Sequence, residues 1–540
     1  MTLNSLAFLA FLAIVLIVYY ALPKKLKKYQ WVVLLIASYG FYLSSGITNV
    51  LFIMSTTVFT FASGLFMQRI RDKQQSYVRS LGDSITKEEK REYKKIANKK
   101  IHTIQVITAL VNLGVLIILK CHGFLFYNLD KLFSLFKWDV SDPLMNLIVP
   151  LCLSYYTFNS IGYLIDIGRG KHAAERNIGK FALFVSFFPS IVQGPLFRYC
   201  DVGVQLTQEH KLNYDNIKYG AQLILWGFFK KLVIADRISA ITAHVFSADF
   251  VAGGYNGTQV FFGVLAYSFQ IYGDFSGGTD ITRGAAQMMG IDLPLNFERP
   301  FFATSMADFW RRWHMSLGAW MREFVFYPVM LCKPVTNLSK KFRKKFGPHA
   351  GKIVPSVAAP FVVFFLIGIW HGITWQYVTN GLYNAILISS TVALTPAYNK
   401  LAKVLHVNTE AFSFRIFQML RTFMLLCISR IIVKAPSLTD AFAMIKSMFT
   451  SIDLGFLFGS DGEIFTYGVD QQGMIILIAA ILLLFVISTL QESGMKIRES
   501  LSRQNLIFRW FLILLLLTVV LVFGVYGPEF DASSFIYGKF

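Results

Sequence analysis

The chain is poor in charged residues, in cysteine and in long polar stretches. Only 15% of its 540 residues are charged and 55% are apolar, and the mean hydropathy of +0.51 is too high for an ordinary soluble protein. The longest polar stretch is residues 69–102, so we expect no second soluble domain. Because the apolar residues fall into separate runs, we expect the chain to lie in a lipid bilayer.

Cysteines and acidic side chains are also scarce. The five cysteines form no Cys-x-x-Cys pair and no Cys/His ligand spacing, and they lie mostly in or beside apolar runs, which predicts buried free thiols and no metal site. Asp and Glu together number 31 against 52 Lys and Arg, which gives a net charge of +21. The cations sit mainly between apolar runs, where membrane topology and anionic lipid account for them, so nucleic-acid binding is disfavoured.

The apolar runs have the length of membrane-spanning helices, which need roughly 20 mostly apolar residues to cross about 30 Å of hydrocarbon. Such runs lie near 5–22, 30–46, 49–67, 103–120, 146–167, 180–197, 217–235, 257–273, 357–370, 376–395, 415–433, 473–490 and 508–526. The segments 121–137 and 317–331 fit short, tilted or re-entrant helices. The sequence therefore predicts an all-α polytopic membrane protein with about 11–13 transmembrane and re-entrant helices.

The N-terminal part of the chain predicts the orientation. The run 5–22 is expected to remain as a helix, because it is long, lacks a basic N-terminal region and has no small-residue cleavage site after it. Basic residues favour cytoplasmic loops, and lysines at 24–28 follow the first run, while the Lys/Glu-rich segment 69–102, which fits a solvated amphipathic helix, follows the third. We therefore predict an extracytoplasmic N-terminus and cytoplasmic segments there and at 340–345.

Polar residues gather directly after one predicted span. Within residues 267–299, Asp274, Asp280 and Arg283 stand beside several glycines. Glycines permit close backbone approach or a broken helix, and broken backbone at membrane depth is found where it lines a cavity. One interpretation is thus a cavity-lining segment, and the other is a helix-packing polar network or a cytoplasmic loop. In either case we expect the carboxylates to pair with nearby arginines.

A helix start is predicted at Ser305, because Ser305 and Asp308 match the [Ser/Thr]-x-x-[Asp/Glu] capping pattern. In such a helix Asp308 and Arg312 form an i, i+4 pair. Trp310 and His314 are also four residues apart, so the indole and the imidazole are expected on one face. His314 is then either a core histidine bonded to backbone or to a nearby carboxylate, or a residue with a secondary catalytic or substrate-positioning role.

His371 ends an almost wholly apolar run, residues 361–370. An ionisable imidazole at membrane depth is costly and therefore marks a candidate site. Gly368 and Gly372 flank the Trp370-His371 pair and leave room for a ligand chain. Burial favours the neutral ring, which is the form that a general base needs. A catalytic base and a structural histidine are both compatible with the residues alone.

Five ordered motifs resemble those of the membrane-bound O-acyltransferase family. They are VPLCLSYYTFNSIGYLIDIGRG at 149–170, FFPSIVQGPLFRY at 187–199, YGDFSGGTDI at 272–281, LPLNFERPFFATSMADFWRRWHMSLGAWMREFVFYPV at 293–329 and GIWHG at 368–372. The likeness is greatest to the bacterial branch of alginate O-acetylases and D-alanyl transfer proteins of teichoic acid modification. One departure follows the WHG motif: many relatives carry Trp-Gly and then His-Gly, whereas this chain has Asn380-Gly381 and Asn384-Ala385.

The resemblance implies a helical bundle around a central tunnel that joins a cytosolic acyl donor to an acceptor on the outer side. It places His371 at the family's essential histidine and His314 at a second, branch-typical histidine, which makes both candidate catalytic residues. The candidate substrate-binding or tunnel-lining residues are Trp310, Arg311, Arg312, Trp370, Asp308 and Asp274. The implied organisation is a single membrane domain, 1–540, with N-terminal helices 1–137, a catalytic core 145–435 and C-terminal helices 436–540.

The resemblance also implies an acyltransferase activity. Because 169 residues with further spans follow His371, as in the polysaccharide acetylases, we expect O-acetylation of an exported polysaccharide in a bacterial cell membrane. Acetyl-CoA is the expected cytosolic donor, with no bound cofactor. An extracytoplasmic acetyltransferase and the polysaccharide biosynthesis machinery are the expected partners, since the chain has no SGNH-type domain. The alternatives are D-alanyl transfer to teichoic acid and, from another class, a multi-span transporter or flippase.

Overall fold

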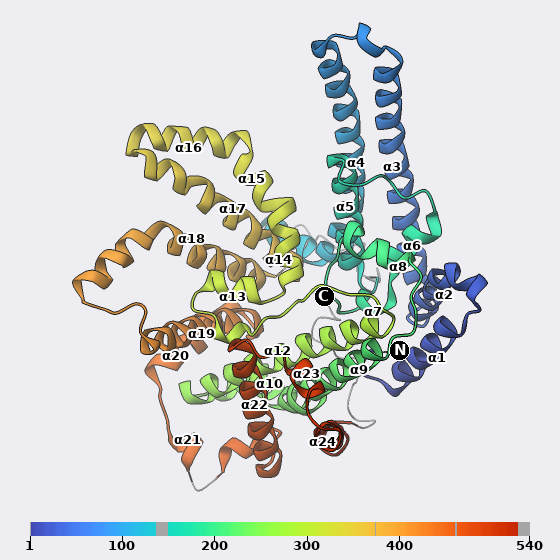
Figure 1. Ribbon diagram of the computed structural model, residues 1–540. Helices are drawn as coiled ribbons and strands as arrows, with labels where there is room; N and C mark the ends of the chain where they lie inside the picture. Colours follow the sequence, from blue (N-terminus) through green and yellow to red (C-terminus); the bar gives the residue numbers. More distant parts are fainter. Residues whose placement is uncertain (1, 137–149, 373, 460–461, 527–540) are drawn as a thin grey trace. The chain divides into compact units, whose positions relative to one another are not determined.

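The computed structural model describes residues 2–136, 150–372, 374–459 and 462–526, and within these ranges it contains helices, turns and loops but no strand (Figure 1). The predicted all-α fold is confirmed. The start of the predicted span 146–167 and the last residue of the segment 121–137 lie outside the described residues. The chain divides into two compact units, Met1–Ala221 with Thr282–Pro294, and Gln222–Ile281 with Leu295–Phe540. The predicted division into 1–137, 145–435 and 436–540 stays a prediction.

The first unit consists of N-terminal helices packed around aromatic side chains. Its helices are α1 (Leu6–Ala21), α2 (Gln30–Leu43), α3 (Ile47–Ser80), α4 (Lys87–Phe133), α5 (Leu153–Arg169), α6 (Ile178–Ser186), α7 (Phe188–Ile191) and α8 (Val204–Thr207). The rings of Phe8, Phe41 and Phe188 lie 6.1–6.4 Å apart, so α1, α2 and α7 share one aromatic core. Such ring pairs add to the stabilisation from buried apolar area.

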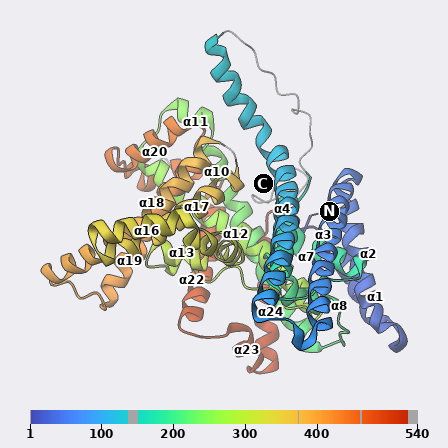
Figure 2. The ribbon, with the colours of Figure 1, turned by 90° about the horizontal axis from the view of Figure 1, so that it is seen from above.

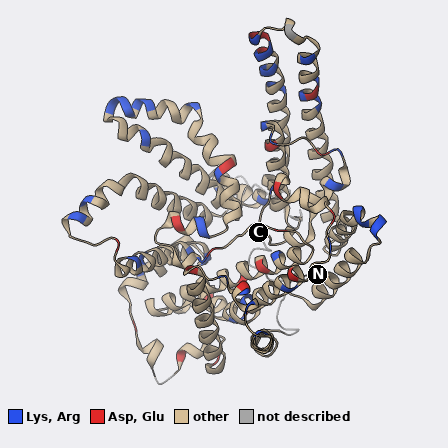
Figure 3. Cartoon of the chain, in the orientation of Figure 1, with Lys and Arg blue, Asp and Glu red and all other residues tan. Residues whose placement is uncertain are grey.

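α3 and α4 form a long helical hairpin, in which the two helices lie side by side in both ribbon views (Figure 2). A capping box starts α4, because the Thr86 hydroxyl accepts the N–H of Glu89 and the Glu89 carboxylate accepts the N–H of Thr86. The polar segment 69–102 is therefore mostly helical, as expected, and basic residues gather at the free end of the hairpin (Figure 3). The runs 103–120 and 121–137 were expected as separate segments, but residues 103–133 all belong to α4, and a 3-10 turn, Ser134–Phe136, follows it.

Two other predicted runs are interrupted. The run 180–197 is not one helix, because Phe187 leaves the helical region at ψ 107° between α6 and α7. Pro189, near the start of α7, has no backbone N–H with which to continue the preceding helix. The segment 317–331 is short and irregular as expected: a π-helical turn, Arg322–Phe326, separates α14 (Met315–Met321) from α15 (Tyr327–Leu331).

The second unit holds most of the remaining helices, while α9 (Tyr214–Phe228) and α12 (Gly257–Met288) contain residues of both units. A π-helical turn, Phe229–Ala235, follows α9. Besides α14 and α15, the helices of the second unit are α10 (Asp236–Val245), α11 (Ala248–Gly253), α13 (Met306–Arg312), α16 (Lys333–Phe346), α17 (Pro348–His371), α18 (Trp375–Val404), α19 (Phe412–Lys434), α20 (Leu438–Thr450), α21 (Gly455–Phe458), α22 (Gln471–Glu492), α23 (Ile497–Ser502) and α24 (Leu506–Phe523).

Six helices in the described part of the chain are long and apolar enough to cross a membrane, by length and composition: α3, α4, α17, α19, α22 and α24. Two shorter apolar segments are Leu6–Ala21 and Ile178–Ile191. Together with the all-helical fold, these helices agree with a polytopic membrane protein. The expected total of about 11–13 membrane helices and the central tunnel stay predictions.

Candidate active site

His371 lines a cavity in the second unit whose walls come from α12, α13, α17, α18 and α19. One part of the lining is aromatic and includes Trp310, Phe364 and Tyr377. The other part is polar and consists of Asn380, Asn384, Ser429 and Arg430. An imidazole and other hydrogen-bonding groups therefore border the same mostly apolar space, which is the usual composition of a small-molecule site.

Glycines bring α17 and α18 together at the cavity. A Cβ atom on Gly381 would lie 2.6 Å from the carbonyl oxygen of Phe364 and 3.4 Å from Gly368 Cα, which is too close for a side chain. The two helices therefore touch through their backbones at Gly368 and Gly381. His371 is one turn beyond Gly368 on α17, and Asn380 directly precedes Gly381 on α18. The crossing thus brings both side chains to the cavity.

Trp370 contacts both candidate histidines. Its ring centroid lies 4.5 Å from that of His371 and 6.1 Å from that of His314. The His371 ring is also nearly parallel to that of Tyr377, with the ring centroids 6.4 Å apart and an interplanar angle of 17°. The structure therefore gathers His371, His314 and Trp370 in one cluster, and of these three only His371 is among the cavity-lining residues.

His314 does not share a helix with Trp310, and this expectation is wrong. α13 ends at Arg312, and His314 adopts a left-handed conformation with φ 47° as the N-cap of α14. The reason is a set of bonds to Asn296, whose carbonyl accepts the N–H of Met315 at 2.9 Å and whose side-chain oxygen lies 3.2 Å from His314 Nδ1. These bonds hold a backbone conformation that costs roughly 1–2 kcal/mol for a residue other than glycine.

His314 is a neutral histidine. It is buried and lies outside the six candidate spans, and burial lowers its pKa to about 3, with a smaller lowering by the positive charge of His371 when that ring is protonated. Its amide partner Asn296 also accepts a bond from the Ser316 hydroxyl at 2.8 Å. A core histidine bonded to backbone or to a carboxylate was one of the two interpretations from the sequence. His314 is buried as that interpretation expects, but its partner is the side-chain amide of Asn296.

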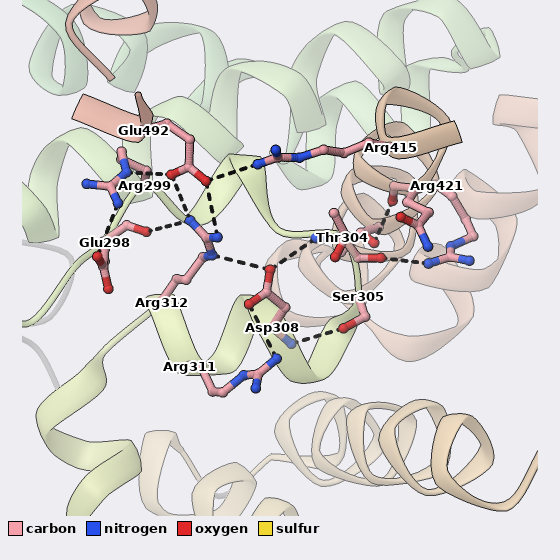
Figure 4. A network of polar contacts seen from close by, with 12 residues as sticks. Glu298, Arg299, Thr304, Ser305, Asp308, Arg311, Arg312, Arg415, Arg421 and Glu492 are labelled. Carbon is pink, nitrogen blue, oxygen red and sulfur yellow. Dashed lines mark hydrogen bonds and ion pairs between the residues drawn. The ribbon is translucent and has the colours of Figure 1, made fainter. Parts of the chain in front are cut away.

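Asp308 and Arg312 form the predicted i, i+4 ion pair, at 3.2 Å between Nε and Oδ2. Ser305 caps α13 as expected, because its hydroxyl accepts the N–H of Asp308. The pair belongs to a larger network that the sequence did not predict, in which three guanidinium groups point toward Glu492 (Figure 4). The Glu492 carboxylate accepts bonds from Arg299 at 2.6 Å, Arg312 at 3.0 Å and Arg415 at 3.2 Å.

None of the residues in the Glu492 network is among those that line the cavity. Asp308 and Arg312 are thus on the network side of this helix, while Phe309 and Trp310 face the cavity. The Arg311 side chain is 65% exposed and contacts Asp308 at 3.5 Å. Among the residues predicted to bind substrate or line the tunnel, only Trp310 therefore lines this cavity.

Asp274 belongs to a buried ion-pair cluster next to the site. Its carboxylate lies 2.6 Å from Lys231 Nζ, which also contacts Asp236 at 2.8 Å, and Lys230 contacts Asp280 at 2.7 Å. These aspartates pair with lysines that were given no role from the sequence, because the π-helical turn after α9 turns two consecutive lysines toward α12. The helix α12 is also unbroken at its glycines, which serve close packing: a Cβ on Gly277 would lie 2.8 Å from the carbonyl oxygen of Gly227.

Four polar cavity residues were assigned no role from the sequence, and three of them form a hydrogen-bond circuit with Trp310. The indole N–H of Trp310 donates to Asn384 Oδ1 at 3.1 Å. Asn384 Nδ2 donates to Asn380 Oδ1 at 3.2 Å and to Ser429 Oγ at 3.3 Å, and the Ser429 hydroxyl donates to Asn380 Oδ1 at 2.6 Å. A signal was present in the sequence, since two asparagines four residues apart in an apolar run share a helix face.

The fourth is Arg430, which is buried beside the aromatic rings of Phe301 and Phe423 at 5.6 and 5.9 Å. A guanidinium over ring faces gains cation–π stabilisation in a low-dielectric setting. Ser429 and Arg430 interrupt the apolar pattern of α19, and intramembrane polar residues of this kind are a recognised pointer to a site.

Comparison with known families decides what kind of protein carries this site. Residues 34–432 match the sequence model of the membrane-bound O-acyltransferase family. The chain belongs to this family. The matched segment contains His314, His371 and all residues that line the cavity except Val433. The site described above therefore lies in the part that defines membrane-bound O-acyltransferases.

Several known proteins are similar to the chain. A probable alginate O-acetylase from Pseudomonas syringae pv. tomato is 31% identical over 308 residues, which is 57% of this chain and 53% of the relative. A peptidoglycan O-acetyltransferase from Helicobacter pylori is 28% identical over 372 residues, 64% of each chain. A teichoic acid D-alanyltransferase from Bacillus subtilis is 32% identical over 252 residues, 46% of this chain and 60% of the relative. The match thus spans about half the length of the first of these relatives.

Proposed function

We propose that this chain is a membrane-embedded O-acyltransferase that moves acetyl groups from a cytosolic donor, acetyl-CoA, for O-acetylation of an exported polysaccharide. The observation that carries the proposal is His371, because it lines a cavity of mixed aromatic and polar character within the family-matched segment. Substrate oxygen and thioester carbon must meet beside such a base for acyl transfer to occur.

In the proposed reaction, His371 acts as a general base and then as a general acid. The neutral imidazole takes the proton of the acceptor hydroxyl while the hydroxyl oxygen bonds to the carbonyl carbon of the thioester. The carbon–sulfur bond then breaks, and the imidazolium returns the proton to the leaving thiolate, so that an ester and a free thiol result. Trp370 and Tyr377, whose rings neighbour that of His371, hold it in one orientation.

His314 plays a supporting part in this proposal. It contacts Trp370 and is bonded to Asn296, so it fixes the indole that packs on His371. Since burial keeps its pKa at about 3, it stays uncharged at neutral pH and does not raise the cost of protonating His371 during the reaction.

The choice of an acetyl group and a polysaccharide is supported by two of the relatives named above, an alginate O-acetylase and a peptidoglycan O-acetyltransferase. Delivery to the glycan through an extracytoplasmic partner, in a bacterial cell membrane, belongs to the same proposal. D-alanyl transfer to teichoic acid is the second candidate, because the D-alanyltransferase is 32% identical over its matched segment. The donor distinguishes them, since D-alanyl transfer requires an amino-acyl thioester.

The proposal is tested by following radiolabelled acetyl groups from acetyl-CoA into alkali-labile ester in membranes that contain the chain. We expect His371→Ala to insert normally but to form no ester, with His371→Gln as a variant that preserves side-chain volume. His102→Ala, which changes an exposed histidine on α4, is the matched control and should retain the wild-type rate. Ester formation by the His371 variants at the wild-type rate, or release of unmodified substrate by the wild type, would overturn the proposal.

A further inference from the structure

Asn380 lies at the same helix crossing as His371 and lines the same cavity. The contact of Gly368 with Gly381 leaves no side chain between the two backbones at this point. A polar side chain beside the proposed base, in a largely apolar cavity, is available to any substrate atom that reacts there.

The hydrogen-bond circuit around Asn380 determines which way its amide faces. An indole N–H only donates, so Asn384 must turn its oxygen toward Trp310 and its Nδ2 toward Asn380. Asn384 Nδ2 donates to the backbone oxygen of Asn380 at 2.9 Å and to its Oδ1 at 3.2 Å. The carbonyl of the Asn380 side chain is therefore held on the circuit side, and the opposite amide orientation would set two N–H groups against each other.

The Ser429 hydroxyl reinforces this orientation. It receives a bond from Asn384 Nδ2 and donates its own proton to Asn380 Oδ1 at 2.6 Å. Both hydrogens of Asn380 Nδ2 are left without a protein acceptor among the described residues, although the side chain is only half-buried and borders the cavity. Three residues from α13, α18 and α19 thus fix the amide and present its donors to the cavity.

We propose that Asn380 is a catalytic residue whose side-chain N–H groups bind the carbonyl oxygen of the acyl donor and stabilise the oxyanion. This inference rests on the acyl transfer proposed above and deepens it. When the acceptor oxygen bonds to the thioester carbon, the carbonyl π electrons move to the oxygen, which becomes negatively charged until the carbon–sulfur bond breaks. A fixed amide donor lowers the energy of this state and costs no reorganisation during the reaction.

Asn384, Ser429 and Trp310 are positioning residues in this arrangement. Their polar atoms are used within the circuit, so they act on the substrate only through the direction of the Asn380 amide. The arrangement predicts a ranking of variants. Loss of the donor itself is most harmful, and loss of a positioning bond has a smaller effect because the amide keeps its donors but gains freedom to rotate.

The experiment compares Asn380→Asp, Asn380→Ala and Ser429→Ala in steady-state acetyl transfer from acetyl-CoA. Asn380→Asp preserves shape and the bond from Ser429 but has no donor, so kcat should fall by about 100–1,000-fold, with KM nearly unchanged. The kcat of Asn380→Ala should fall by a similar factor, and the kcat of Ser429→Ala should fall by about tenfold. Asn216→Asp, the same change on α9 at a residue that does not line the cavity, should retain the wild-type kcat.

A spectroscopic readout separates a catalytic role from a structural one. In the inactive His371→Ala background, carbonyl-labelled ¹³C-acetyl-CoA should show a C=O stretch at lower frequency when bound than in solution. Adding Asn380→Asp should abolish this shift. Wild-type kcat in Asn380→Asp, together with an inactive His371→Ala, would overturn the inference and leave the proposed function standing. A wild-type chain that forms no ester would overturn both.

Discussion

Gly368 and Gly381 are in backbone contact: a Cβ atom on Gly368 would lie 3.3 Å from Gly381 Cα and 2.6 Å from the carbonyl oxygen of Tyr377. This contact places the C-terminal end of α17 directly against the first turns of α18. Both groups with a proposed catalytic role, the imidazole of His371 and the amide of Asn380, sit at this contact. A change in the distance between α17 and α18 would therefore displace both groups relative to each other.

Gly368→Ala is expected to impair both folding and activity. The added methyl group meets backbone atoms that cannot move aside, and overpacking of this kind costs roughly 1–3 kcal/mol. Gly114→Ala on α4 is the control, because no atom lies within 4 Å of its Cβ position, and it should be neutral or slightly stabilising. Thermal unfolding in detergent and acetyl transfer measure the two effects. A fully active and stable Gly368→Ala would contradict this account of the crossing.

Glu492→Gln should weaken the second unit and lower kcat. The change removes the negative charge with which Arg299, Arg312 and Arg415 all pair. A hydrogen bond to a charged group contributes roughly 1.5–3 kcal/mol to stability. Arg312 is two residues before His314, so the loop that carries this histidine is held less firmly once Arg312 loses its ion pair with Glu492. Equal melting temperatures for Glu492→Gln and wild type would speak against the network.

The control for that experiment is Glu499→Gln in the same C-terminal region. Glu499 pairs with Lys496, and the two side chains are 50% and 74% exposed. Exposed pairs of this kind add little to stability. Glu499→Gln should therefore behave as the wild type in both unfolding and acetyl transfer.

Lys231→Met should be strongly destabilising. The Lys231 side chain is 2% exposed and lies between the carboxylates of Asp236 and Asp274. Removing the cation leaves buried negative charge, which costs about 3–5 kcal/mol. Adding Asp274→Asn should restore part of the loss. Lys218→Met, at a lysine whose partner Asp215 is exposed, should change the yield of folded protein little. An unaltered yield for Lys231→Met would exclude the cluster as a structural element.

Acid should destabilise the protein through His314. In the unfolded chain a histidine has a pKa near 6.5, whereas burial lowers the folded value to about 3. The unfolded state thus binds more protons between these limits, so the stabilisation is fully present above about pH 6.5 and is lost as pH falls, by about 1.4 kcal/mol per pH unit. The melting-temperature difference between wild type and His314→Gln should therefore shrink from pH 7.5 to pH 5. A constant difference would contradict the neutral buried ring.

Local patterns predicted the site helices well and their endings poorly. The capping pair Ser305 and Asp308 was found from the sequence, because a cap acts within one turn and needs no distant partner. The end of α13 before His314 was missed, because Asn296, from another segment, supplies the bonds that hold the left-handed turn. Helix periodicity carries no information about such a non-local acceptor.

The charged and polar partners show the same limit. Lys231 stands in an apolar run, and a regular helix would not be expected to turn both it and Lys230 toward α12, but a π-helical turn does so. Glu492 is 180 positions from Arg312, so no sequence window contains both. Asn380 was noted only as a departure from the family pattern. Its orientation became evident once Trp310 and Ser429 were placed around it.

The length of α4 limits what its basic end does at the membrane. If the apolar part of α4 that follows Ile101 crosses the hydrocarbon along the membrane normal, Lys87 and Lys90 stand roughly 16–21 Å further along the helix axis, at 1.5 Å per residue. Electrostatic screening at physiological ionic strength acts over about 8 Å. In that arrangement lysines near Ile101 interact with anionic headgroups, whereas the cations at the tip are screened from the bilayer surface and interact with water and dissolved anions.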